Sequence, residues 1–194
     1  MYWFGLHPGI KVVLLAALLI GAMLVFAQVR SDYRRHRKLS RPVAWLQTGY
    51  FIIYALCAYV FVDSRLSRID PGAWTTPASI VMMSAGVLIL AFSMPILGGR
   101  SFGGHVGRLY TTGLYRYSRN PQLIGGFLLM AGYALLWPSV HGLLWAALWP
   151  VISHLMVRGE EAHLREVFGE EYAAYCARTP RYLGWPRHRP QLPT

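Results

Sequence analysis

The sequence predicts an all-α integral membrane protein with about five transmembrane helices, in which helices four and five form a hairpin and a C-terminal interfacial helix follows. Three observations lead to this prediction. Of the 194 residues, 55% are hydrophobic and only 14% are charged, compared with roughly 25% charged residues in soluble domains. Five apolar runs approach membrane-spanning length. Basic and non-basic loops alternate between those runs, as they do in membrane proteins with a fixed orientation.

The apolar runs give the expected helices in chain order. They are Gly9–Val29, Trp45–Val62, Pro77–Leu97, Gln122–Trp137 and Val140–Val157. A helix that crosses the hydrocarbon core needs about 20 apolar residues, and the fourth run is short by this measure. Pro138 separates the last two runs, and because proline interrupts helices, these two runs predict a tight hairpin.

Apolar residues continue at helical spacing from Ala162 to Cys176, with polar residues on the opposite face and an interruption at Gly169. This pattern predicts an amphipathic helix at the membrane interface. We therefore expect a single membrane domain over residues 1–194. Three spans occupy residues 1–97, a loop with the hairpin and the C-terminal helix occupies 98–184, and 185–194 is a tail.

The distribution of basic residues predicts the orientation. The loop after the first run holds six Lys/Arg residues, the stretch from Arg100 to Arg119 holds four arginines, and the chain from Arg158 onward holds six more. The positive-inside rule then places the N-terminus outside and the C-terminus in the cytoplasm, in a bacterial or archaeal inner membrane. The net charge of +11 is explained by this bias, and without a recognition module it does not indicate nucleic acid as a partner.

One polar region precedes the hairpin, in the stretch "GGRSFGGHVGRLYTTGLYRYSRNPQLIGG". Its arginines, Arg108, Arg116 and Arg119, can hold a carboxylate or phosphate. Asn120 and Pro121 are typical of a helix start, where Asn can cap the helix and free amide groups can meet an anion. An ordinary basic loop followed by an Asn-Pro helix start explains the same residues equally well.

A second polar region is the pair Glu160 and Glu161, directly after the fifth run. Adjacent carboxylates so close to the hydrocarbon boundary are costly unless they have partners. In the simpler interpretation the helix leaves the membrane there, the glutamates face water, and Glu161 forms a surface pair with Arg165 four residues later. The histidines show no metal-ligand spacing, so no metal site is expected.

Three segments follow one another in the chain: "GRLYTTGLYRYSRNPQLIGG", an apolar hairpin and "RGEEAHLREVFGEEYAAYCARTPRYL". In this order they resemble the C-terminal half of the isoprenylcysteine carboxyl methyltransferase and phospholipid methyltransferase superfamily. The resemblance covers about residues 100–184. The resemblance implies an S-adenosylmethionine-dependent methyltransferase with a cytoplasmic cofactor pocket and a lipophilic or membrane-embedded acceptor: a carboxylate, amine or thiol. Asn120 stands where the family usually has histidine. Gln122 and Leu123 stand where it usually has Met and Tyr.

The resemblance also implies the site residues. Arg119 and Glu160 are the expected catalytic residues. The expected cofactor-binding residues are His105, Leu109, Tyr110, Gly113, Tyr115, Tyr117, Arg119, Asn120, Glu160 and Glu161. Two other functions remain open: an NADPH-dependent membrane reductase of the sterol-reductase type, and a non-catalytic lipid-binding membrane protein. The sequence specifies neither the acceptor nor the oligomeric state.

Overall fold

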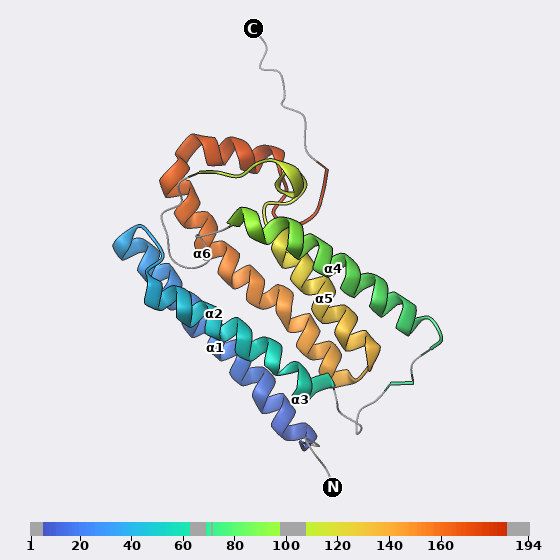
Figure 1. Ribbon diagram of the computed structural model, residues 1–194. Helices are drawn as coiled ribbons and strands as arrows, with labels where there is room; N and C mark the ends of the chain where they lie inside the picture. Colours follow the sequence, from blue (N-terminus) through green and yellow to red (C-terminus); the bar gives the residue numbers. More distant parts are fainter. Residues whose placement is uncertain (1–5, 63–68, 71, 98–107, 186–194) are drawn as a thin grey trace.

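The computed structural model describes residues 6–62, 69–70, 72–97 and 108–185, and this part of the chain is built from helices without a strand. The elements are α1 (Pro8–His36), α2 (Arg41–Leu56), α3 (Ala58–Val62), α4 (Thr75–Leu97), η3 (Gly113–Arg116), α5 (Pro121–Leu136) and α6 (Val140–Arg178). The helices lie side by side in a bundle, with α1 beginning at one end and α6 finishing at the other (Figure 1). The predicted all-α membrane fold is confirmed.

Among the residues that the structure describes, four helical segments are long and apolar enough to cross a membrane. They are α1, α2 together with α3, α4 and α6. The fourth predicted run is the shorter helix α5, whose 16 residues extend for only about 24 Å at 1.5 Å per residue, compared with a hydrocarbon core of about 30 Å. All five predicted runs are therefore helical, and the fourth of them, α5, is shorter than a full span.

The two hairpin turns that position the bundle are held by side chains. Between α1 and α2, the buried Asp32 accepts a hydrogen bond from the amide of Ser40 at 2.6 Å and contacts His36 Nδ1 at 2.9 Å. Between α5 and α6, the buried Ser139 caps α6 by accepting from the amide of Gly142 and donates to the carbonyl of Phe61. The predicted α5–α6 hairpin is thus tied directly to the end of α3.

Aromatic side chains from α2 and α6 form the centre of the bundle. Tyr54 and Trp145 are fully buried and stack with ring centroids 5.2 Å apart. Each donates its polar hydrogen to the other residue's carbonyl oxygen, so neither polar tip is left unpaired. Because an unpaired polar group is costly in an apolar core, this reciprocal pair fixes the register between the two helices.

Helices α4 and α5 pack with their backbones in close approach. A Cβ atom at Gly86 would lie 2.7 Å from the carbonyl oxygen of Gly125, and one at Gly132 would lie 3.0 Å from that of Ser79. Only small residues permit such contact, which is the usual mode of helix association in lipid. The outer face of α4 exposes Val81 and Phe92, as expected for a lipid-facing helix.

The predicted interfacial helix is the last part of α6 rather than a separate element. Gly169 has φ 50° and ψ −120°, which breaks the regular helix at the predicted position. Figure 1 shows the end of α6 lying across the end of the bundle, beside the segment that precedes α5. Tyr172 and Tyr175 are buried there against Leu109. The apolar face of this helix therefore covers the connecting segment as well as the bundle.

Candidate active site

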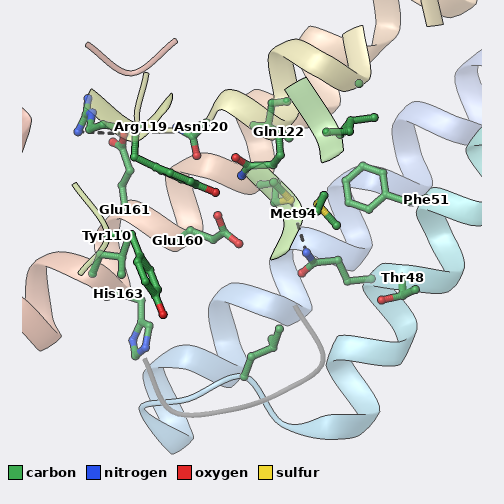
Figure 2. A pocket seen from close by; sticks show the side chains of 18 of the residues that line it. Thr48, Phe51, Met94, Tyr110, Arg119, Asn120, Gln122, Glu160, Glu161 and His163 are labelled. Atoms are coloured by element: carbon green, nitrogen blue, oxygen red, sulfur yellow. Dashed lines mark hydrogen bonds and ion pairs between the residues drawn. The ribbon is translucent and has the colours of Figure 1, made fainter. Parts of the chain in front are cut away.

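A cavity of about 450 Å³ lies where α6, α5 and the segment before it meet α1, α2 and α4. One end of the cavity, which we call the charged end, is lined by Arg119, Glu160 and Glu161 with tyrosines around them. The other, which we call the apolar end, is lined mainly by apolar side chains of α2, α4 and α5, such as Phe51 and Met94 (Figure 2). Polar and apolar ligand groups can thus occupy one continuous space.

Glu161 is the centre of the charged end, with a side chain only 4% exposed. Arg181 binds it in a bidentate manner, with Nε–Oε1 at 3.0 Å and Nη2–Oε2 at 2.7 Å. Arg119 Nη1 lies 3.2 Å from Oε1, and Arg165 Nη2 lies 3.9 Å from Oε2. The interpretation of Glu161 as a water-facing residue is therefore wrong, although the i,i+4 contact with Arg165 is present.

Arg119 is held from several sides. Its side chain is 10% exposed and reaches both Glu161 and the sulfur of Cys176, while its amide donates to the carbonyl of Pro180 at 3.0 Å. The Nε atom is buried and has no hydrogen-bond partner among the described residues. A guanidinium fixed in this way keeps one donor for a ligand, and anions are its preferred partners.

Glu160 and Glu161 have different surroundings although they are neighbours in the chain. Successive residues of an α-helix point about 100° apart because a turn takes 3.6 residues. Figure 2 shows Glu161 turned toward Arg119 and Glu160 turned into the open cavity. Glu160 is therefore the carboxylate that a bound molecule can meet, and Glu161 is the one that organises the arginines.

The residues after α6 close the charged end against the segment before α5. Asn120 Nδ2 donates to the carbonyl of Arg181 at 3.0 Å, and the hydroxyl of Tyr182 lies 2.9 Å from His154 Nδ1. Asn120 is the N-cap of α5, as expected, but its side chain makes no capping bond because its amide is used in this link. The hydrogen bonds from Arg181 to Glu161 raise the pKa of the guanidinium, so Arg181 stays positively charged at physiological pH.

Most of the predicted site residues line this one cavity. Those that do are Leu109, Tyr110, Tyr115, Arg119, Asn120, Glu160 and Glu161. Tyr117 and Gly113 are not among the lining residues: Tyr117 is 41% exposed and packs edge-on against Trp185, and Gly113 adopts φ 61° at the start of η3. His105 lies outside the described residues.

Several lining residues were not predicted. Tyr33 of α1 stacks on His163 of α6, with ring centroids 4.3 Å apart, and both border the cavity. Gln47 of α2 and Trp149 of α6 also line it, and Arg181 completes the charge cluster. The one available signal was Gln47, a polar residue inside the second apolar run. The others depend on how distant helices pack.

The helices and the cavity define an integral membrane protein with a polar site that continues into an apolar chamber. A family model described as phospholipid methyltransferase matches residues 78–171, which cover most of α4, all of α5 and most of α6. This match covers just under half of the chain, confirms the expected resemblance and supports a membrane methyltransferase in general. Searches of curated proteins and of solved structures gave no match.

Proposed function

We propose that this protein is an S-adenosylmethionine-dependent methyltransferase that acts on a lipophilic or membrane-embedded acceptor. The observation that carries the proposal is the form of the cavity, which joins a charged end at Arg119, Glu160 and Glu161 to an apolar end between α2, α4 and α5. A charged cofactor and an apolar acceptor need these two environments next to each other.

The residues at the charged end fit the methionine part of S-adenosylmethionine. That part carries a carboxylate and an ammonium group. The buried Nε of Arg119, which no described residue accepts from, suits the carboxylate, and Glu160 suits the ammonium. Tyr110 and Leu109 offer flat and apolar surfaces for the adenosine.

When bound, S-adenosylmethionine supplies a methyl group that is already activated for transfer. The protein then has to align the acceptor and keep water away, which the enclosed apolar end favours. For an acceptor that loses a proton on methylation, Glu160 is the carboxylate positioned to receive it. Arg119 holds the cofactor in place and acts through that contact.

The arrangement of basic residues supports a cytoplasmic position for the cofactor site. The last turn of α1 carries Arg34 and Arg35, and the last turn of η3 carries Arg116. Both helices finish at the same end of the bundle as α6 (Figure 1), and Arg119, Glu160 and Glu161 line the charged end of the cavity. By the positive-inside rule this end faces the cytoplasm.

Calorimetric titration of the detergent-purified protein tests the proposal against its two alternatives. S-adenosylhomocysteine, the stable product form of the cofactor, is titrated in one experiment and NADPH in another. Binding of S-adenosylhomocysteine alone is the expected result. Binding of NADPH alone would replace the methyltransferase with a reductase, and binding of neither would favour a non-catalytic lipid-binding protein.

A further inference from the structure

Two carboxamide side chains lie in the mainly apolar part of the cavity, where the proposed cofactor site does not use them. Gln47 comes from the middle of α2, and Gln122 comes from the first turn of α5. Both line the cavity together with Glu160. They are far apart in the chain, so only the folded bundle brings them to the same space.

The two carboxamides have in common an oxygen atom that nothing nearby satisfies. The Oε1 atoms of Gln47 and Gln122 are buried and accept no hydrogen bond from the described residues. The amide nitrogen of Gln47 donates to the thioether sulfur of Met156 at 3.5 Å, which is a weak contact. Buried polar atoms are normally satisfied, and those that are not point to a ligand or to water.

The charges around the cavity indicate what kind of group these oxygens meet. Among the described lining residues, Glu160 and Glu161 are acidic and Arg119 is the one arginine, already bound to Glu161. A carboxylate in the apolar end would face two carbonyl oxygens and the Glu160 carboxylate. A group that donates hydrogen bonds would instead satisfy both oxygens and be attracted by Glu160.

We propose that Gln47 and Gln122 recognise the reacting group of the acceptor, and that this group is an N–H or O–H donor on an apolar body. This inference rests on the proposed function and narrows it, because it excludes a free carboxylate as the acceptor. An apolar body extends past Phe51 and Met94 between α2 and α4.

Binding of brominated amphiphiles in lipid nanodiscs tests the inference. The probes are the dodecyl amine, alcohol, carboxylate and methyl ester, each with a terminal bromine that quenches tryptophan on contact. Trp149 lines the cavity, so a probe bound in the cavity quenches its fluorescence. Probe that only partitions into the lipid quenches the other tryptophans in the wild type and in Trp149→Phe alike. The difference in quenching between the two proteins therefore measures binding in the cavity. Thermal unfolding checks that Trp149→Phe is folded.

The amine and alcohol probes should quench Trp149 at concentrations about tenfold lower than the carboxylate and ester, the effect of about one buried hydrogen bond. Gln47→Met and Gln122→Met keep the side-chain volume but remove the oxygen, and each should reduce this preference to about twofold. Gln122→Glu keeps acceptor oxygens and should retain the preference for the amine.

Two results would overturn the inference: equal or tighter binding of the carboxylate probe, or an unchanged preference in both methionine variants. S-adenosylhomocysteine is titrated in the same preparations. Its affinity should be the same in Gln47→Met as in the wild type. Failure of S-adenosylhomocysteine to bind the wild type would reject the proposed function instead. A preference for the amine and alcohol probes would then describe a lipid-binding cavity.

Discussion

The two ends of the cavity satisfy their polar groups in different ways. At the charged end, Glu161 is bound by Arg119 and Arg181 before any ligand arrives. At the apolar end, the oxygens of Gln47 and Gln122 have no described partner. Pre-formed charge pairs make a rigid site that a ligand can enter without rearrangement. Unpaired oxygens give selectivity, because a molecule that donates no hydrogen bond to them binds with lower affinity.

The largest effect should come from removing the centre of the charged end. Glu161→Ala leaves Arg119 and Arg181 buried or half-buried without their counter-charge, and breaking a buried ion pair costs about 3–5 kcal/mol. Thermal unfolding in detergent should show a clearly lower midpoint than the wild type. Glu170→Ala, at an exposed position of the same helix, is the matched control and should unfold with the wild type. Equal midpoints for Glu161→Ala and Glu170→Ala would mean that the cluster does not stabilise the fold.

Reducing the space at the apolar end should weaken ligand binding there without changing cofactor binding at the charged end. A Cβ atom at Gly126 would lie 2.4 Å from the ring of Trp149, so Gly126→Ala pushes that ring into the cavity, and overpacking of this kind costs about 1–3 kcal/mol. Binding of the brominated amine should weaken while the affinity for S-adenosylhomocysteine stays unchanged. Gly49→Ala, where a Cβ meets nothing within 4 Å, should leave both unchanged. Equal losses for both ligands in Gly126→Ala would show that the two ends are not separable.

Removing Arg119, the expected partner of the cofactor's carboxylate, should weaken cofactor binding. Arg119→Ala should weaken S-adenosylhomocysteine binding by at least about 1–2 kcal/mol, the contribution of a charge-assisted hydrogen bond. Arg165→Ala is the control, because its side chain is 60% exposed and lies 3.9 Å from Glu161, and exposed pairs contribute at most about 1 kcal/mol. Calorimetry on both variants gives the comparison. Similar affinities in the two would place the carboxylate elsewhere.

Glu160→Gln should have the smallest effect on stability of these substitutions. This substitution removes a charge but keeps the shape of a side chain that faces the cavity. We expect S-adenosylhomocysteine binding to weaken by about 1–2 kcal/mol because the ammonium loses a charged partner, with an unfolding midpoint close to that of the wild type. A large loss of stability with unchanged affinity would mean that Glu160 stabilises the fold and does not bind the cofactor.

Much of the fold could be predicted because membrane spans are a matter of length and composition. The runs at Gly9–Val29 and Pro77–Leu97 both lie within helices, and Gly169 marks the interruption of α6. The C-terminal helix was expected at the membrane interface, and in the structure it continues from α6 and covers the segment before α5. Its apolar face is visible in the sequence, whereas the surface that it covers is set by tertiary packing.

Most residues of the candidate site could be named from the sequence, but the contacts between them could not. Arg119 and the glutamates do line one cavity, because the hairpin returns the chain to the same end of the bundle. The partner of Arg119 is Glu161 rather than Glu160, a difference decided by the rotation of α6, which periodicity alone does not give. Arg181 and Gln47 depend on contacts between distant elements, and a single sequence contains no direct signal for these.

Ultraviolet crosslinking of methyl-labelled S-adenosylmethionine to the purified protein, followed by tryptic peptide mapping, tests the position of the cofactor site most directly. The label should appear in residues 109–116 or 159–165, which contain Tyr110 and Tyr115 or the glutamate pair, and excess unlabelled S-adenosylhomocysteine should prevent it. Label confined to α1, α2 or α3, or label that the competitor does not reduce, would contradict a cofactor site at the charged end of this cavity.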